Sequence, residues 1–408
     1  MFEHSVAKIS VMEFPIKRIV PIPNLVLGTS CMLLMFQAYL IAPLQLSLAT
    51  EFDSSLVNLG IPAFAIGFAL AAGAMDSFWI FVKPAKIFLM SLVALCLGTL
   101  LLSTVKSAGW FLLIKVLTGL GTGAMLPSVL IMATNCDVET GSLKNLTFII
   151  FALATGMTLG PSTGGWLNES LGWRSIYCLV GVVAGFLCLL FLLDKSNKLL
   201  DQQNGGLHYP TLNKPDKQAR YIYTFVFLTG VFHSGVFVWV SYYFTTQYGL
   251  DEFSVANVLF IFGLPGLVIS ILMHIYRIDN EVIKVLYPGF LLTLAGLFIL
   301  MMNVDLWLAK CLLAIISVGF SCTQPLFIGI IKLPRPGISV ARPLAKGCGI
   351  LFAGYGIGPV IMLALLDAPK TVGLGFLVLL VVALAIVSPR IWNFPKFTKP
   401  ALKLNKIK

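Results

Sequence analysis

The chain has 408 residues, of which 58% are hydrophobic and 11% are charged, and its formal net charge is +11. A soluble globular domain has about 25% charged residues, so this composition and a mean hydropathy of +0.94 exclude that class. Apolar runs repeatedly reach the roughly 20 residues that cross a bilayer. We therefore predict an all-α polytopic membrane protein.

The N-terminal segment does not resemble a cleavable signal peptide. Residues 1–20 contain charges of both signs, and the apolar run that follows is too long for the h-region of a signal peptide. No small-residue cleavage site of the A-x-A kind comes after that run. We expect the first span to stay in the mature protein as a membrane anchor.

Hydropathy predicts twelve spans separated by short connections, with one longer polar loop at 194–220. This loop divides the chain into an N-terminal six-helix bundle at 1–193 and a C-terminal six-helix bundle at 221–391, followed by a basic tail at 392–408. The predicted spans are 22–46, 56–76, 84–104, 110–134, 144–167, 173–193, 221–247, 254–277, 282–303, 305–331, 343–367 and 371–390.

The basic residues predict the orientation. Loops on the cytoplasmic side of a membrane protein are enriched in Lys and Arg. With both termini and the central loop cytoplasmic, all but five of the 28 basic residues fall on the inner side; the exceptions are Lys106, Lys115, Arg174, Lys310 and Lys370. The positive net charge therefore needs no nucleic-acid partner. We predict an integral plasma-membrane protein, in a bacterium the inner membrane.

An internal repeat supports the division into two halves. Three glycine–proline patterns occur in the same order in each half, and two of them recur at a spacing of 198 residues. Two homologous halves with a substrate site at their interface form a known transporter architecture. The matching sets are Gly121 and Pro127 with Gly319 and Pro325, Gly156, Gly160 and Pro161 with Gly354, Gly358 and Pro359, and Gly60 and Pro62 with Gly263 and Pro265.

The fifth predicted span contains the segment GMTLGPSTGG at 156–165. Gly156, Gly160 and Gly164 fall on one face of a helix, with Gly165 beside them, and such a face lets another backbone approach closely. Pro161 removes one helix hydrogen bond and favours a kink. The alternative interpretation is a packing groove without a conformational role.

These residues carry a family resemblance. The pattern G-x3-G-P-x2-G-G resembles motif C, the antiporter motif of the major facilitator superfamily. The fourth predicted span resembles motif B of the same family, with the pattern Lys115-x3-Gly119-x-Gly121-x-Gly123-x3-Pro127. Lys115 stands where the family usually has arginine. The resemblance covers nearly the whole chain and implies twelve transmembrane helices in two pseudo-symmetric six-helix bundles.

Motif A of that family, the loop after the second span, departs from the family pattern. Asp76 is present, but the arginine and glycine that should follow it are replaced in the sequence Asp76-Ser77-Phe78-Trp79. The resemblance implies that this loop latches the cytoplasmic side. We expect that latch to be weak or different here.

Few ionisable side chains lie inside the predicted spans, and such residues are usually functional. Lys115 is a candidate cationic site for substrate or coupling, with snorkelling to the outer interface as the alternative. His233 is a candidate proton-titrating site, with a core histidine as the alternative. The resemblance implies that spans 1, 4, 7 and 10 line the cavity. Candidate substrate-contacting side chains in or near it are Gln37, Gln324, Trp239, Tyr242 and Tyr355.

The sequence favours a secondary transporter that exports a small organic molecule in exchange for protons. The alternatives are an importer of a small polar nutrient and a membrane enzyme, although the four histidines are scattered and the eight cysteines form no C-x-x-C pair. No phosphate-binding G-x4-G-K-[ST] loop is present, so ATP does not drive transport directly. We expect a monomer in the lipid bilayer without metal or cofactor.

Overall fold

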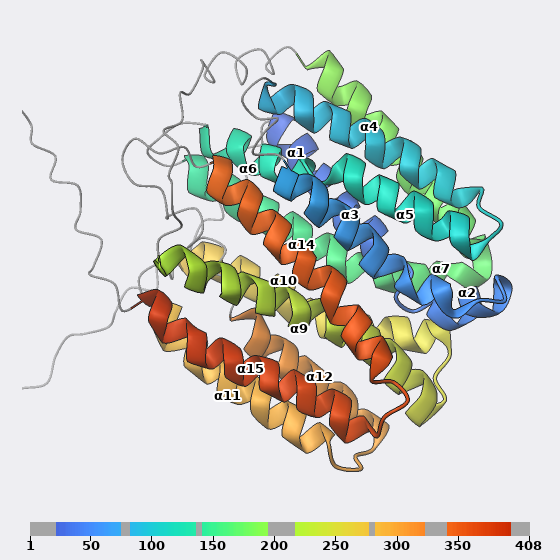
Figure 1. Cartoon of the computed structure of the whole chain (residues 1–408), viewed down its shortest axis with the longest axis vertical. Helices are drawn as coiled ribbons and strands as arrows, with labels where there is room; N and C mark the ends of the chain where they lie inside the picture. Colours follow the sequence, from blue (N-terminus) through green and yellow to red (C-terminus); the bar gives the residue numbers. More distant parts are fainter. Residues whose placement is uncertain are drawn as a thin grey trace, which may run out of the picture.

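The computed structural model describes residues 22–74, 82–135, 141–194, 217–276, 282–322 and 341–392, and these residues form helices and no β-strand. The elements are α1 (Ile22–Tyr39), α2 (Gln45–Glu51), the 3-10 helix η1 (Ser55–Leu59), α3 (Gly60–Ala74), α4 (Pro84–Ser103), α5 (Ala108–Thr122), α6 (Met125–Asn135), α7 (Gly141–Leu193), α9 (Lys217–Tyr248), α10 (Glu252–Tyr276), α11 (Val282–Leu300), α12 (Leu306–Ser321), α14 (Ala341–Ala364) and α15 (Lys370–Trp392). Figure 1 labels all of them except η1.

The predicted all-α membrane fold is confirmed. In the described part of the chain, eight helices are long and apolar enough to cross a membrane, and three shorter apolar helices accompany them. One of the eight, Phe148–Leu193, overlaps two of the predicted spans. Every predicted span therefore overlaps an apolar helix, although only the first part of the span predicted at 305–331 is described, as α12.

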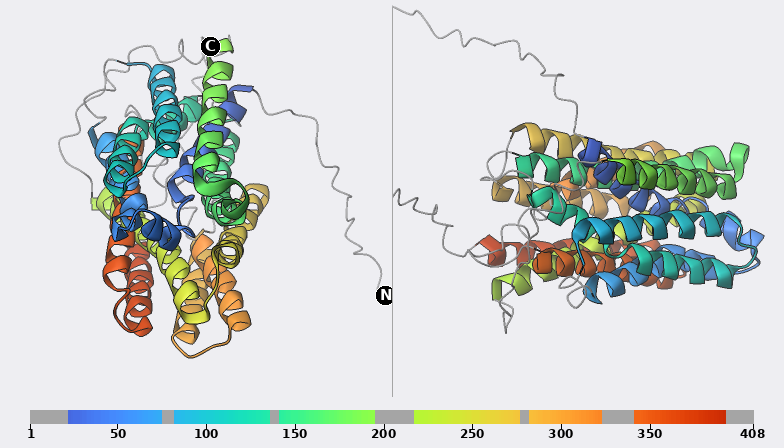
Figure 2. Two further views of the ribbon diagram at one scale, coloured as in Figure 1. Left: turned by 90° about the vertical axis from the view of Figure 1, so that its right-hand side faces the viewer. Right: turned by 90° about the horizontal axis from the view of Figure 1, so that it is seen from above.

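The helices of the first half form one group and those of the second half another (Figure 1). The first group contains α1 to α7, and the second contains α9 to α15. Across the boundary between them, α14 packs on α3 and α6, and α10 packs on α7. The helices run roughly parallel to one another from one side of the molecule to the other (Figure 2). We call the end that holds α2 and the start of α10 the α2 end.

The first predicted span is not one helix, as 22–46 implied. Helix α1 ends at Tyr39, and α2 begins at Gln45 after a tight turn. Pro43 lies in this turn, where it cannot donate a backbone hydrogen bond and disfavours helix at the preceding residue. The turn is held by short-range bonds from the Ala42 N–H to the Tyr39 carbonyl (2.9 Å) and from the Leu44 N–H to the Ile41 carbonyl (3.0 Å).

Spans five and six are two helices that meet at a kink within α7. The kink is at Gly172, whose backbone is non-helical, with φ 73° and ψ 147°. A positive φ of this kind suits glycine, which has no Cβ to clash. Pro161 lies inside α7 among residues with helical dihedral angles, so the kink expected there does not interrupt the helix.

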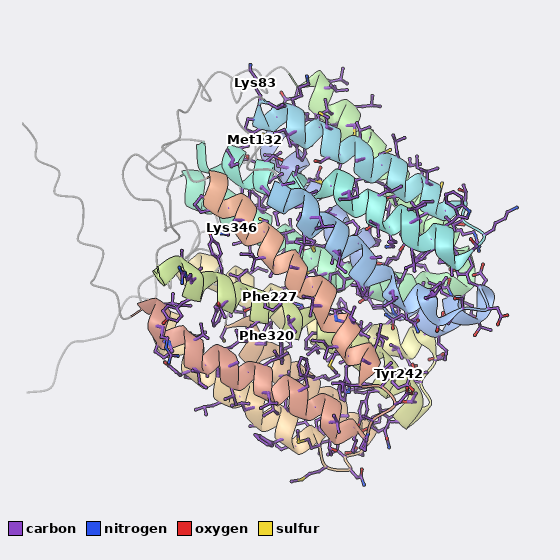
Figure 3. The ribbon with its side chains drawn as sticks, viewed as in Figure 1. Lys83, Met132, Phe227, Tyr242, Phe320 and Lys346 are labelled. Atoms are coloured by element: carbon purple, nitrogen blue, oxygen red, sulfur yellow. The ribbon has the colours of Figure 1, made fainter. Side chains whose placement is uncertain are left out.

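The outer surface of the helices is apolar, as a lipid-facing surface requires. Figure 3 draws the side chains that extend from the ribbon on all sides. Large apolar side chains are exposed on helices of both halves, among them Leu101, Leu189, Phe298 and Leu379. In a soluble protein such extensive exposure would mark an interaction surface, and in this fold the hydrocarbon of the bilayer covers it.

Candidate substrate site

A small cavity lies where the two groups of helices meet. Its volume is about 30 Å³, well below the roughly 300–1,000 Å³ of a pocket for a drug-sized ligand. In this conformation the cavity is therefore too small for a drug-sized molecule. Its lining comes from α7 of the first half and from α9, α10 and α12 of the second: Ala154, Met157, Thr158, His233, Phe237, Phe262, Gly263, Gly266, Ser317, Phe320 and Ser321.

His233 of α9 is surrounded by aromatic rings. Its imidazole lies parallel to the Phe237 ring, with centroids 5.3 Å apart and 6° between the planes. Phe320 meets it edge-on at 5.6 Å and Tyr355 at 6.2 Å. Edge-to-face and offset-stacked pairs are the favoured aromatic geometries. Among the described residues that line the cavity, His233 is the one with an ionisable side chain.

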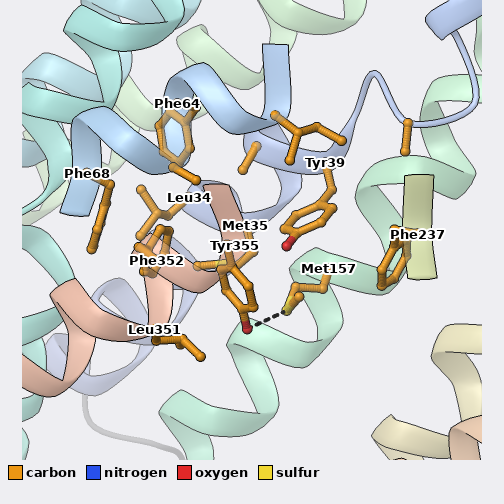
Figure 4. Close-up of a cluster of buried hydrophobic side chains, with 14 of the residues drawn as sticks. Leu34, Met35, Tyr39, Phe64, Phe68, Met157, Phe237, Leu351, Phe352 and Tyr355 are labelled. Atoms are coloured by element: carbon orange, nitrogen blue, oxygen red, sulfur yellow. Dashed lines mark hydrogen bonds between the residues drawn. The ribbon is translucent and has the colours of Figure 1, made fainter. Parts of the chain in front are cut away.

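Tyr39 and Tyr355 extend this aromatic cluster toward the first half (Figure 4). The Tyr39 ring lies 5.2 Å from the Phe237 ring and 6.1 Å from the Tyr355 ring. The Tyr355 hydroxyl donates to the sulfur of Met157 over 3.9 Å, whereas the buried Tyr39 hydroxyl has no hydrogen-bond partner. An unpaired buried hydroxyl is costly.

Sequence reasoning did not select Tyr39, Thr158, Phe237, Phe262 or Phe320. Tyr39 had a signal, because it is the tyrosine in a first span that otherwise offers few polar groups. The phenylalanines had none, because an apolar ring in a membrane helix is as often turned to lipid as to a cavity.

Lys115 is fully buried in α5, which rules out snorkelling to the membrane interface. Its ammonium donates to the backbone carbonyl of Gln37 over 3.0 Å. It also lies 5.0 Å from the centre of the Tyr177 ring, with the Phe64 and Phe111 rings at 6.0 and 5.8 Å. These contacts place Lys115 inside the first group of helices, and it does not line the cavity.

The carbonyl that Lys115 reaches belongs to the last turn of α1, where carbonyls lack intrahelical donors. A basic side chain at this position interacts favourably with the negative end of the helix dipole. Lys115 therefore caps the interrupted first span. Gln37 itself is fully buried, and neither atom of its side-chain amide has a hydrogen-bond partner.

The remaining candidates lie in different surroundings. Trp239 stacks on Tyr243 at 4.5 Å and lies against Gly373 of α15, within the second group. Tyr242 is 39% exposed near the end of α9 (Figure 3). Neither lines the cavity, whereas Tyr355 contacts His233 beside it. Gln324 and Asp76 lie outside the described residues.

The glycine face of α7 packs on α1, as the spacing predicts. A Cβ on Gly156 would overlap the Met32 carbonyl, one on Gly160 would lie 2.6 Å from the Phe36 carbonyl, and one on Gly164 would overlap the Leu40 carbonyl. Three successive turns of α7 are thus in backbone contact with α1. Gly165 lies on a different face, where a Cβ would be 2.5 Å from the Cβ of Ala256 in α10.

The glycines of the fourth predicted span serve contacts within the first group. A Cβ on Gly119 would overlap the Phe64 carbonyl of α3, and one on Gly123 would lie 2.6 Å from the Phe68 carbonyl. Gly121 faces α4, where a Cβ would be 2.5 Å from that of Ala94. Pro127 lies in α6, beyond the break after α5.

Comparison with known families agrees with this architecture. A family model described as Major Facilitator Superfamily matches residues 25–333. Two solved structures resemble the fold at 13% sequence identity. One, a bacterial homologue of the human lysosomal transporter Spinster, has a TM-score of 0.66 and covers 92% of this chain and 97% of its own. The human organic anion transporter MFSD10 has a TM-score of 0.71, with 90% and 100% covered.

Three curated relatives match parts of the chain. An uncharacterized MFS-type transporter, YbcL of Bacillus subtilis, is 23% identical over 61% of this chain and 63% of its own length. A probable sugar efflux transporter of Pasteurella multocida is 25% identical over 50% of each chain. The purine ribonucleoside efflux pump NepI of Escherichia coli is 24% identical over 65% of this chain and 69% of its own. The matches thus span between half and about two thirds of these relatives.

Proposed function

The chain belongs to the major facilitator superfamily and is a membrane transporter rather than an enzyme, and we propose that it exports a small organic molecule in exchange for protons. The observation that carries this proposal is the cavity between the two halves, with His233 as its titratable side chain. In alternating access the halves rock about such a central site. Two curated relatives with efflux in their names support the direction.

We propose that His233 carries the proton coupling. The ring is in contact with the aromatic cluster on three sides, so a proton gained or lost there changes the charge of a site that is otherwise apolar. A charged imidazolium disfavours an empty apolar cavity and favours a hydrated one. Protonation and substrate binding at the same cavity then alternate, which is the requirement of an antiporter.

The substrate we propose is uncharged. The described residues that line the cavity include no Asp or Glu to balance a cation, and Lys115 is enclosed away from it and cannot balance an anion there. Burying an unpaired charge is expensive. The hydroxyls of Thr158, Ser317 and Ser321, together with the rings of Phe262 and Phe320, suit a polar molecule with a planar part. Sugars and purine ribonucleosides, the compounds named for two relatives, are uncharged.

The experiment uses purified transporter in proteoliposomes with an imposed pH gradient. Three compounds are tested as substrates: a purine ribonucleoside, a hexose and the cationic dye ethidium. For each, we measure movement across the membrane in the direction opposite to proton flow. We expect gradient-driven movement of an uncharged compound and none of ethidium. The rate should depend on pH in the parent protein, and this dependence should vanish in His233→Gln.

The matched control is His208→Gln, because His208 lies in the predicted central loop. It should keep the parent's pH profile. Robust ethidium export would refute the proposed substrate class, and an unchanged pH profile in His233→Gln would refute the role of His233. We also propose that the protein lies in the plasma membrane, the inner membrane of a bacterium, with both termini cytoplasmic, as its basic residues indicate.

A further inference from the structure

In the part of the chain that the structure describes, three side-chain hydrogen bonds join the two halves at the α2 end, and none of them belongs to the substrate site. Glu252, the first residue of α10, accepts hydrogen bonds from the Ser47 hydroxyl of α2 and from the side-chain amide of Asn168 in α7, the latter at 2.8 Å. A little over one turn further along α10, the indole N–H of Trp166 donates to the side-chain oxygen of Asn257 over 2.9 Å. Every donor lies in the first half and every acceptor in the second.

Helices α7 and α10 pack closely at this point, where α7 has a glycine. A Cβ on Gly165 would lie 2.6 Å from the Glu252 carbonyl and 2.5 Å from the Cβ of Ala256. Gly165 therefore brings Trp166 and Asn168 within reach of α10. Further along the same face of α7, Thr158 packs on Gly263 of α10. The helix spacing places Ser162, which is fully buried, between these two contacts.

Hydrogen bonds to an ionised acceptor are roughly twice as strong as neutral ones. Glu252 receives two of them, from different elements of the opposite half. Alternating access requires α7 and α10 to separate at whichever end of the molecule opens. Both bonds to Glu252 must then break whenever the α2 end opens.

We propose that Glu252, with Ser47 and Asn168 as its donors, is a latch that holds the α2 end closed and sets how often that end opens. The Trp166–Asn257 hydrogen bond lies further along α10 than the latch, and it forms and breaks together with it. Glu252 is a positioning residue, because it acts on the relation of the two halves and does not reach the cavity. The latch rests on the family's alternating access and on neither the proposed substrate nor the proton coupling.

A neighbouring acid, Asp251, provides a control that distinguishes loss of the latch from loss of negative charge at this end of the molecule. Asp251 is exposed, and its carboxylate accepts from the Ser254 N–H over 3.0 Å at the start of α10. Hydrogen bonds from the side chain and backbone of Ser254 hold the pKa of Asp251 below its usual value. Asparagine keeps this capping bond, so Asp251→Asn removes one negative charge beside Glu252 and leaves the latch intact.

The experiment measures how fast a buried reporter becomes accessible. Ser162→Cys is introduced in a background without the eight native cysteines, and its reaction with a membrane-impermeant maleimide is followed in proteoliposomes without substrate or pH gradient. Because neither is present, the outcome is independent of the proposed antiport. Reconstituted protein in both orientations ensures that the α2 end is reachable in part of the sample.

We expect Glu252→Ala to raise the reaction rate at least tenfold and Asn168→Ala to raise it several-fold. The double variant should react little faster than Glu252→Ala alone, because both substitutions remove the same Asn168–Glu252 hydrogen bond. Glu252→Gln should give an intermediate rate, since its amide oxygen still accepts, and Asp251→Asn should react like the parent. If Glu252→Ala does not fold, the pair Ser47→Ala and Asn168→Ala must give the same acceleration. Unchanged reporter rates in the folded variants would overturn the latch.

Discussion

Met157 and Tyr355 are 198 residues apart in the chain, and the hydroxyl of Tyr355 donates a hydrogen bond to the sulfur of Met157. The same spacing relates Gly156 to Gly354 and Gly160 to Gly358. The two residues therefore occupy equivalent positions in the two halves, and they touch each other at the boundary between them (Figure 4). Equivalent residues of two halves meet only near the axis that relates the halves.

Contacts of the glycines repeat across that axis. In the first half, Gly156 and Gly160 of α7 lie against the carbonyls of Met32 and Phe36 in α1. In the second half, Gly354 and Gly358 of α14 meet the carbonyls of Phe227 and Val231 in α9. The internal repeat is thus present in the packing as well as in the sequence.

Replacing Tyr355 tests whether its ring or its hydroxyl matters at this axis. Sulfur is a weak acceptor, and the ring makes aromatic contacts with Tyr39, Phe352 and His233. We expect Tyr355→Phe to keep at least half of the transport rate and Tyr355→Ala to lose about tenfold. Initial rates in proteoliposomes measure both. A strong loss in Tyr355→Phe would instead assign the hydroxyl a direct part in transport.

Gly160→Leu should abolish transport. The first side-chain atom would already lie 2.6 Å from the Phe36 carbonyl, and a backbone carbonyl cannot move aside without shifting α1. We expect the variant to reach the membrane, with a lower thermal midpoint and transport below a tenth of the parent's. The transport rate of Gly160→Ala should lie between that of the parent and that of Gly160→Leu.

A matched control for this substitution exists in α15. A Cβ on Gly375 would meet nothing within 4 Å, so Gly375→Leu adds the same side chain to a membrane helix without a steric conflict. Its transport should equal the parent's. Normal transport by Gly160→Leu would mean that the close approach of α7 and α1 has no role in the cycle.

The elements of this fold are predictable because their signals are local. Membrane length identifies the helices, and a spacing of four residues identifies the glycine face of α7. The break after Tyr39 and the kink at Gly172 between spans five and six are less predictable, because both depend on how short connections pack. Pro43 gave a local reason for the first, and Gly172 for the second.

The site was harder to predict because it is made of contacts between distant segments. His233 and Tyr355 could be selected as polar groups in apolar spans, and they lie side by side. Lys115 was selected by the same argument, but its long side chain is turned into the first group, toward α1. Which face of a helix a lysine occupies depends on its neighbours in three dimensions, which the spacing along one helix does not contain.

Lys115→Met tests whether this lysine serves stability or function. Its hydrogen bond to the Gln37 carbonyl contributes about 1.5–3 kcal/mol, and aromatic contacts add about 0.5–2 kcal/mol. The desolvation penalty of a buried ammonium is several kcal/mol, and the described residues provide no ion-pair partner for Lys115. Replacement by an apolar side chain of similar length is therefore not expected to lower the thermal midpoint.

Transport should nevertheless fall in Lys115→Met, by about fivefold or more, because the last turn of α1 loses its cap beside the aromatic cluster. Lys115→Arg, which can still donate to the Gln37 carbonyl, should retain transport. Thermal melting in detergent measures the effect on stability, and initial transport rates measure the effect on function. A midpoint lowered by many degrees with unchanged transport would make Lys115 a purely structural residue.

The orientation predicted from the basic residues is testable with two single-cysteine variants in a background without native cysteines. Ser170 is exposed in α7 beside Asn168 at the α2 end, and Asn204 lies in the predicted central loop. Positive charge is retained on the cytoplasmic side during insertion, so we expect the α2 end to face outward. Ser170→Cys should react with an impermeant thiol reagent in intact cells. Asn204→Cys should react only after the cells are opened, and the reverse pattern would invert the assignment and make the Glu252 latch an inner gate.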